Sequence, residues 1–375
     1  MKSKFGIYIH VPFCRSKCNY CNFYSTANQS LTEKYTTALE NEILNRKNEE
    51  QGEVSSIYLG GGTPSMMNKK WFTRIFDLLF SNYNINTDAE ITIECNPDDV
   101  TVDFLNSIKK HVNRLSIGTQ SFNDMTLAFL SRKHSAQKGI DSIKLAQDFG
   151  FENITADLIY GVPNASLEMF EKDVQQFLDL KIPHLSAYSL TVEEKTKLSL
   201  EISKGIKIET SENEAETQYL WLMKKMREEG FLHYEISNFA RPNYESKHNS
   251  SYWIRQAYLG FGPSAHSFSI NKRRWNVASV AQYIHKIENN ETYHEDETLS
   301  EIDKLNEYIM TGLRTNVGIS IDEIASKCDP KMMSIFNKNL ELVDSKLYNI
   351  TDNNMILNDK GKLFADGVAA TLFFC

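Results

Sequence analysis

Short β-rich runs alternate with longer stretches of helical period over the first 200 residues. Six runs of apolar and β-branched residues are short enough to be strands, at residues 5–10, 55–59, 90–94, 114–117, 154–159 and 184–189. Between them, apolar positions recur with helical spacing over residues 31–46, 71–80, 101–110, 136–149 and 167–180. This order is typical of repeated βα units around a parallel sheet. The pattern therefore predicts an α/β fold in which six units form a partial (β/α)6 barrel.

The alternation stops beyond residue 205. A helix is predicted over residues 211–229, because the segment opens with capping-box spacing and stops at Gly230. β-rich runs follow at residues 234–239, 258–259 and 265–269, and helical periods at 280–288 and 301–311. Short helices and a strand pair around residues 349–357 are typical of a small winged-helix module. We therefore expect a barrel at residues 1–205, an α+β region at 206–300 and a winged-helix-like module at 301–375.

Polar and glycine residues follow each predicted strand of the barrel. The carboxyl ends of parallel strands meet at one end of a sheet, and ligands of α/β folds bind there. We therefore expect one composite site built from six loops. In chain order these loops contain Cys14, Cys18 and Cys21; Gly60, Gly61, Gly62 and Thr63; Glu94; Gly118 and Gln120; Asp157; and Ser189 and Thr191.

The charge of the chain limits its partners. Lys and Arg number 41 against 49 Asp and Glu, a formal net charge of −8. Nucleic-acid binding is not expected without a basic field, and the winged-helix-like module is expected to serve as a packing element or lid. His10 and Pro12 interrupt the first apolar run, so neither a secretory signal nor a membrane span is expected and the chain is predicted to be cytoplasmic. The sequence leaves peripheral membrane contact and a homodimer open.

The six cysteines are unevenly distributed. Cys14, Cys18 and Cys21 crowd into one loop, while Cys95, Cys328 and Cys375 stand alone. In a reducing compartment, three close thiols are metal ligands or catalytic groups before they are disulfides. Zinc needs four ligands in a closed site, and His10 is a candidate for the fourth. Three thiolates also suit a [4Fe–4S] cluster whose remaining iron is open to a small chelating molecule.

The segment from Tyr8 through Cys21 and the run from Gly60 to Pro64 resemble the radical S-adenosylmethionine (SAM) superfamily. Within it, they resemble the branch of oxygen-independent coproporphyrinogen III oxidases and HemW heme chaperones. The resemblance implies that the open iron binds the amino and carboxylate groups of SAM, and that an electron from the cluster can cleave its sulfonium to a radical. Whether this chain cleaves SAM stays open. The residues expected at the SAM site are Tyr8, Tyr20, Gly61, Gly62, Thr63, Glu94, Gln120, Arg132 and Asp157.

A second motif of this branch lies near residue 250. The segment His248-Asn249-Ser250-Ser251-Tyr252-Trp253 fits the H-N-x-x-Y-W pattern of the HemW branch. A neutral imidazole is a sound axial ligand for heme iron, and the two aromatic rings offer flat apolar area. The resemblance thus implies heme bound by His248, Asn249, Tyr252 and Trp253, with heme-accepting apoproteins as partners. His266 is a second candidate ligand, and residues 272–274 could pair with the propionates.

Two departures separate the branches. The oxidases have a further cysteine two residues after the third, where this chain has Phe23, and they carry a longer segment ahead of the cluster. We therefore expect a heme chaperone. The alternative is the oxidase itself, which decarboxylates coproporphyrinogen III to protoporphyrinogen IX. A cluster-bearing scaffold that does not use SAM is a third interpretation, which the Gly60–Gly62 run and Glu94 disfavour.

Overall fold

The computed structural model describes residues 3–374, so Cys375 lies outside the described residues. All six predicted strands of the barrel are present and lie side by side in chain order, each parallel to the next. They are β1 (Lys4–Val11), β2 (Glu53–Gly61), β3 (Ile85–Cys95), β4 (Arg114–Gln120), β5 (Asn153–Tyr160) and β6 (His184–Ser189).

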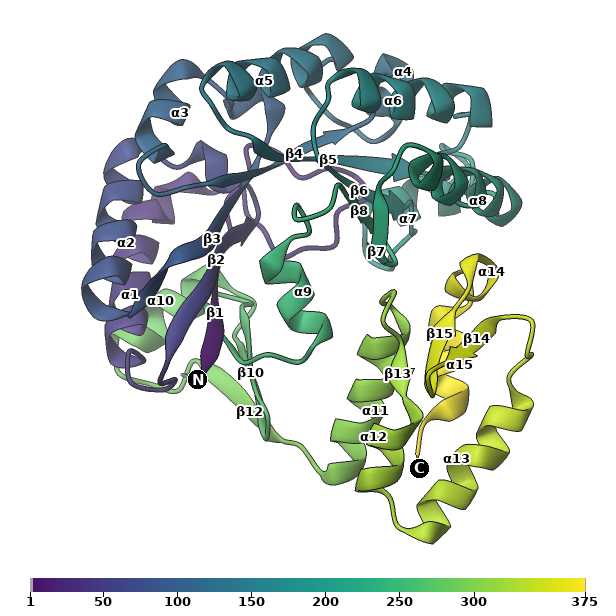
Figure 1. The fold of residues 1–375 in the computed structure, drawn as a ribbon. Coiled ribbons are helices and arrows are strands. Elements are labelled where there is room, and N and C mark those ends of the chain that lie inside the picture. Colours follow the sequence, from purple (N-terminus) through teal and green to yellow (C-terminus); the bar gives the residue numbers. More distant parts are fainter. Residues whose placement is uncertain (1–2, 375) are drawn as a thin grey trace.

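Helices cover the convex side of this sheet (Figure 1). The predicted ones are α1 (Thr32–Asn45), α2 (Lys69–Asn82), α3 (Val102–Ile108), α5 (Ala136–Asp148) and α6 (Leu167–Asp179). All but α1 begin after a serine, threonine or asparagine whose side chain accepts a backbone N–H of the first turn. Each buries an apolar face against the strands, which places the largest core between sheet and helices. The short helices α4 (Asp124–Phe129) and α7 (Lys197–Ser203) were not predicted.

The sheet continues beyond both edges of the barrel. β9 (Tyr258–Phe261) pairs parallel to β1, and β10 (His266–Ser269), β11 (Lys272–Asn276) and β12 (His294–Thr298) follow antiparallel. At the other edge, β8 (Asn238–Ala240) and β7 (Leu232–Glu235) extend β6, with α8 (Glu212–Glu228) preceding them. The order of the twelve strands ends at β12 and β7, which makes the barrel partial, as predicted.

The basic triplet of β11 pairs with acidic side chains of the neighbouring strand. Lys272 and Arg274 contact Asp296, and Arg273 contacts Glu297. In this structure the triplet is therefore already paired with carboxylates, and its pairing with heme propionates stays a prediction. β11 and β12 were not predicted, because neither strand alternates between apolar and polar residues. Ion pairs between the two strands stabilise their pairing instead.

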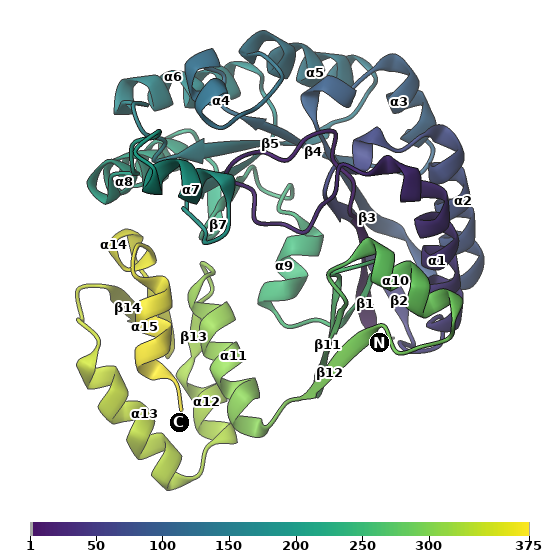
Figure 2. The same ribbon diagram turned by 180° about the vertical axis from the view of Figure 1, so that it is seen from behind.

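One helix lies on the concave side of the sheet. Figures 1 and 2 both show α9 (Lys247–Trp253) inside the arc of the strands. The Glu90 carboxylate on β3 accepts the backbone N–H groups of Lys247 and His248, each at 3.0 Å. A carboxylate at a helix N-terminus satisfies otherwise free donors and favours the helix dipole. The H-N-x-x-Y-W segment is thus a helix held within the barrel.

The C-terminal part has a core of its own. Its helices are α11 (Glu301–Leu313), α12 (Ile321–Lys327), α13 (Pro330–Leu342), α14 (Asp359–Lys362) and α15 (Ala365–Leu372), and its sheet has the order β13 (Ile319–Ser320), β15 (Asn354–Leu357), β14 (Tyr348–Thr351). A helix, a strand, two helices and a hairpin follow one another, which is the expected winged-helix-like arrangement. The hairpin turns at Asp352 and Asn353, both with positive φ.

Backbone hydrogen bonds attach this module to the barrel side of the chain. The N–H of Ile236 donates to Arg314 O at 2.9 Å, and the N–H of Asn316 donates to Tyr234 O at 3.1 Å. The segment between the two parts contains α10 (Val280–Glu288), which packs on α1. The boundaries at residues 205 and 300 stay predictions. Within residues 3–374, no helix has both the length and the apolar character that a membrane crossing requires.

Candidate functional site

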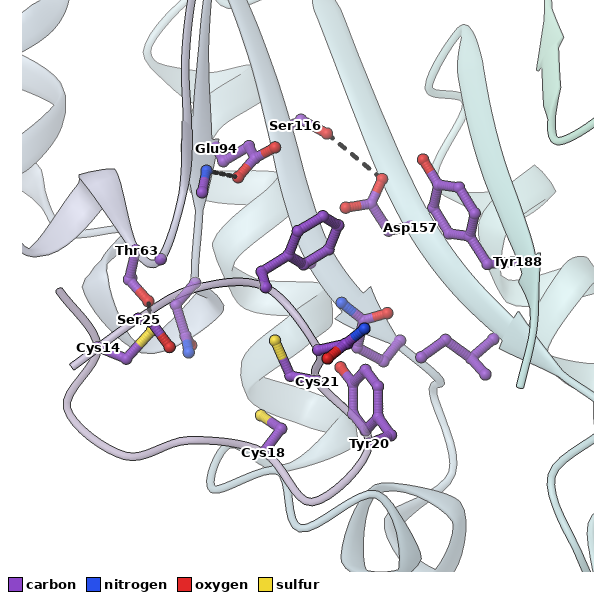
Figure 3. Close-up of a pocket in the computed structure, with 18 of the residues that line it drawn as sticks. Cys14, Cys18, Tyr20, Cys21, Ser25, Thr63, Glu94, Ser116, Asp157 and Tyr188 are labelled. Atoms are coloured by element: carbon purple, nitrogen blue, oxygen red, sulfur yellow. Dashed lines mark hydrogen bonds between the residues drawn. The ribbon is translucent and has the colours of Figure 1, made fainter. Parts of the chain in front are cut away.

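A pocket of about 650 Å³ opens at the carboxyl ends of the barrel strands. Figure 3 shows side chains from the cysteine loop and from several strands around it. The pocket brings together most of the residues that the sequence predicts for the cluster and for SAM. Its lining includes Cys14, Cys18, Tyr20, Cys21, Gly61, Gly62, Thr63, Glu94, Gln120, Arg132, Asp157 and Asn249. The composite site expected from the strand-end loops therefore exists as one cavity.

The three cysteines of the loop are free and partly buried. The Thr63 hydroxyl donates to the Cys14 sulfur at 3.4 Å, and the Arg132 guanidinium donates to the Cys18 sulfur at 3.6 Å. Donors directed at sulfur stabilise thiolates and the negative charge of a cluster. Burial raises the pKa of Cys21 in the free protein. The donor set fits a cluster with three protein thiolates.

A zinc site at this loop finds less support. His10, the candidate for a fourth ligand, hydrogen-bonds through Nδ1 with the Tyr8 hydroxyl at 3.1 Å and through Nε2 with Tyr24 O at 3.0 Å. Burial lowers the pKa of His10 to about 4. Both ring nitrogens of His10 are therefore occupied inside the protein.

The glycine run joins β2 to the cysteine loop. Gly61 has φ +104°, and a Cβ there would lie 2.5 Å from the His10 ring; a Cβ at Gly62 would lie 2.6 Å from Phe13 O. The N–H of Gly62 donates to Val11 O and the N–H of Thr63 to Phe13 O, each at 2.7 Å. These glycines thus let two backbones pack closely. In this structure the N–H groups of Gly62 and Thr63 already have partners within the protein.

Two carboxylates face the pocket. Glu94 accepts the Tyr58 hydroxyl at 2.9 Å and the N–H of Gly61 at 3.0 Å. Asp157 accepts the Ser116 hydroxyl at 3.3 Å (Figure 3). Burial raises the pKa of Glu94 to about 7 and that of Asp157 to about 6, and the charge of Asp157 adds to the shift of Glu94. Carboxylates held in this way can accept hydroxyl donors from a ligand such as a ribose.

We expect the Glu94→Gln variant to change how stability depends on pH. The folded protein holds the Glu94 proton up to about pH 7, whereas the ordinary pKa is 4.5. The stability due to this proton is therefore present below pH 4.5 and is lost as the pH rises through 7. Allowing for partial exposure to solvent, the loss is on the order of 2 kcal/mol. Urea unfolding at pH 5 and pH 8 measures the change. Between these two pH values, the free energy of unfolding should fall by about 2 kcal/mol more in wild type than in the variant. An equal fall in both proteins would contradict the raised pKa of Glu94.

The remaining predicted SAM residues divide between the lining and the interior. Arg132 donates to Gly118 O at 2.7 Å and also approaches Tyr20, which fixes its guanidinium beside the cysteine loop. Gln120 ends β4 with φ +65°. Tyr8 is the exception, since it does not line the pocket: its ring lies 6.2 Å from the Tyr58 ring.

The residues predicted for heme do not form one open surface. Only Asn249 lines the pocket. His248 is 1% exposed, and its Nδ1 and Nε2 hydrogen-bond with the Ser56 and Tyr252 hydroxyls, each at 2.8 Å. Trp253 is partly buried and lies under the Arg314 guanidinium at 5.7 Å. In this structure His248 therefore has no free ring nitrogen, whereas the second candidate, His266, is exposed.

Several lining residues were missed by sequence reasoning: Tyr58, Arg114, Ser116, Ser186 and Tyr188. Side chains of a strand alternate between its faces, so positions two apart share one side. Tyr58 precedes Gly60 by two residues and Ser116 precedes Gly118 by two, and this spacing could have identified them. Phe23, in place of the oxidase cysteine, lines the pocket and is 70% exposed.

Comparisons with known proteins agree with this picture. The radical SAM superfamily matches residues 8–177, and the HemN C-terminal domain matches residues 299–364. The heme chaperone HemW of Bacillus subtilis (strain 168) is 35% identical over 368 residues, covering 96% of this chain and 97% of that protein. The heme chaperone HemW of Lactococcus lactis subsp. lactis (strain IL1403) is 32% identical over 357 residues, covering 94% and 93%.

A solved structure shares the fold over nearly the whole chain. Coproporphyrinogen III oxidase (HemN) from Escherichia coli, described as a radical SAM enzyme, aligns with a TM-score of 0.85 at 23% identity, covering 99% of this chain and 90% of that chain. At this identity the likeness concerns the fold alone. It confirms the predicted α/β class, a partial barrel followed by a C-terminal module.

Proposed function

The chain belongs to the HemW family of the radical SAM superfamily, and from this premise we propose that it binds heme and passes it to heme-accepting proteins of the cytoplasm. The observation that carries the proposal is the likeness to heme chaperones over nearly the whole length of chain and relatives. The absence of a fourth thiol at Phe23, where the oxidases have one, supports the chaperone over the oxidase.

The pocket supports a [4Fe–4S] cluster and SAM as cofactors of this function. Cys14, Cys18 and Cys21 would hold three irons, and SAM would occupy the cavity beside them. When bound, the cluster supplies an electron that can reach SAM. The chain's own part is to bind and orient: Thr63 and Arg132 donate to the cysteine sulfurs. Glu94 and Asp157 line the same pocket and would accept hydroxyl donors of the ligand.

For heme, we assign the axial ligand to Nε2 of His248. Burial lowers the pKa of His248 to about 3, so its ring is neutral and a lone pair is available for iron at ordinary pH. Iron can reach Nε2 only after the Tyr252 hydroxyl leaves it. Heme loading therefore requires α9 or the Tyr252 side chain to move, with Trp253 next to it as apolar area for the macrocycle.

Titration with hemin tests this assignment. Wild type should give a Soret band on binding hemin. In His248→Ala the affinity for hemin should fall at least tenfold, because the axial ligand is lost. Tyr252→Phe should bind hemin at least as tightly as wild type, because it frees Nε2 without removing the ring. An unchanged spectrum and affinity in His248→Ala would refute the ligand, and loss of binding in His266→Ala alone would move it to His266.

A further inference from the structure

We propose that His248 is also a positioning residue of the SAM pocket, acting through Tyr58 on Glu94. This rests on the proposed function only in taking SAM as the ligand of the pocket. The role belongs to the heme-free protein, where the buried imidazole of His248 stacks on Tyr58, a residue that lines the pocket.

The imidazole is held in one place by its surroundings. Its nitrogens hydrogen-bond with the Ser56 and Tyr252 hydroxyls at 2.8 Å, and its own backbone N–H donates to Glu90 at 3.0 Å. Either hydroxyl can donate or accept, so a neutral ring of either tautomer is satisfied on both sides. Such a ring is a rigid support for whatever packs on it.

Tyr58 is the group that packs on it. The rings of His248 and Tyr58 are stacked with centroids 5.0 Å apart and an angle of 24° between their planes. Tyr8 completes the group, 6.2 Å from Tyr58 and 6.5 Å from His248. The Tyr58 hydroxyl then donates to Glu94 Oε1 at 2.9 Å. The path from His248 to the pocket carboxylate thus consists of one ring stack and one hydrogen bond.

The fold explains why this path exists. Ser56 and Tyr58 are alternate residues of β2 and both face α9, while Glu90 and Glu94 lie four residues apart on β3. Ser56 and Glu90 hydrogen-bond with His248 and so hold α9 in place. Tyr58 and Glu94, nearer the carboxyl ends of the same two strands, line the pocket. Without the His248 ring, Tyr58 loses one face of its packing and its hydroxyl is no longer fixed toward Glu94.

The role of His248 has a consequence for regulation. The His248 ring that stacks on Tyr58 is also the ring that we assign to heme iron. Binding of heme to this ring can therefore change its stacking on Tyr58. Any effect of heme on SAM affinity must be matched by an equal effect of SAM on heme affinity.

A double-mutant cycle tests the inference in cluster-loaded, heme-free protein, with SAM affinity measured by equilibrium dialysis. We expect His248→Ala and Tyr58→Phe each to weaken SAM binding about tenfold, the size expected for the loss of one buried hydrogen bond. The double variant should bind no more weakly than Tyr58→Phe alone, because both changes act on one bond. His248→Phe, which keeps the ring stack and loses the hydrogen bonds, should bind SAM more tightly than His248→Ala.

His233→Ala is the matched control. The ring of the partly buried His233 stacks on Phe239 with centroids 4.2 Å apart, and its Nε2 hydrogen-bonds with Ile236 O at 3.3 Å. Neither partner lines the pocket, so SAM affinity should be unchanged. If His248→Ala does not fold, His248→Gln takes its place in the cycle. Unchanged SAM affinity at position 248, additive effects, or an equal loss in His233→Ala would overturn the inference. Wild-type protein that holds a cluster but binds no SAM would overturn the proposed SAM site and this inference with it.

Discussion

Cys18→Ala is expected to abolish the cluster. Anaerobic reconstitution of wild type should give about four irons per chain, and the variant should retain close to none. Cys18 lies between the other two thiols in the loop and is the one whose sulfur accepts the Arg132 guanidinium. With only Cys14 and Cys21 left, two irons would lack a protein ligand. Iron analysis and the visible absorption of the cluster measure the loss.

Cys328→Ala is the control for this experiment. Cys328 is also free and partly buried, but it lies at the end of α12 in the C-terminal module. Its replacement should leave the iron content at the wild-type value. One zinc per chain in wild type, or full iron content in Cys18→Ala, would contradict the cluster.

Gly61→Ala is expected to destabilise the protein by about 3 kcal/mol or more. The left-handed backbone at φ +104° costs an alanine roughly 1–2 kcal/mol. The new methyl group would also lie 2.5 Å from the His10 ring, which hydrogen bonds with Tyr8 and Tyr24 prevent from moving. Overpacking of this kind adds roughly 1–3 kcal/mol. Urea unfolding measures the sum, and SAM binding should fall because Gly61 also donates to Glu94.

Two other glycines separate the causes. Gly150 has φ +84° with no atom near a new Cβ, so Gly150→Ala should show the backbone cost alone, roughly 1–2 kcal/mol. Gly367 lies in α15 with open space around it, so Gly367→Ala should stabilise the protein by roughly 0.5–1 kcal/mol. If Gly61→Ala costs no more than Gly150→Ala, the contact with His10 is not the reason for glycine at this position.

The parts of the fold that the sequence predicted are those fixed by local pattern. β1 to β6 and the helices between them follow from strand length, helical period and N-cap residues. β9 was predicted as a β-rich run, but its parallel pairing with β1 joins residues more than 240 positions apart, as the register of Gly6 with Tyr258 shows. β11 and β12 are stabilised by ion pairs between strands, which no local pattern displays.

The candidate site also has a part that the sequence predicted and a part that it did not. Strand-end residues such as Glu94 and Asp157 were predictable, because topology brings all strand ends to one side of the sheet. The burial of His248 was not predictable, since the motif indicates only a candidate heme ligand, whereas the structure buries the ring against Tyr58. The backbone N–H of His248 donates to Glu90, a carboxylate 158 residues away in sequence. Long-range capping of this kind leaves no trace in the motif itself.

Transfer of heme is the central claim, and one anaerobic assay tests it directly. Heme-loaded, cluster-containing protein is mixed with a heme-free acceptor, SAM, a reductant and coproporphyrinogen III, and both the acceptor spectrum and the porphyrin products are followed. The account predicts that the Soret band of the acceptor grows as the donor loses heme, while coproporphyrinogen III is unchanged. Robust formation of protoporphyrinogen IX with no gain of heme by the acceptor would contradict it and would place the chain among the oxidases.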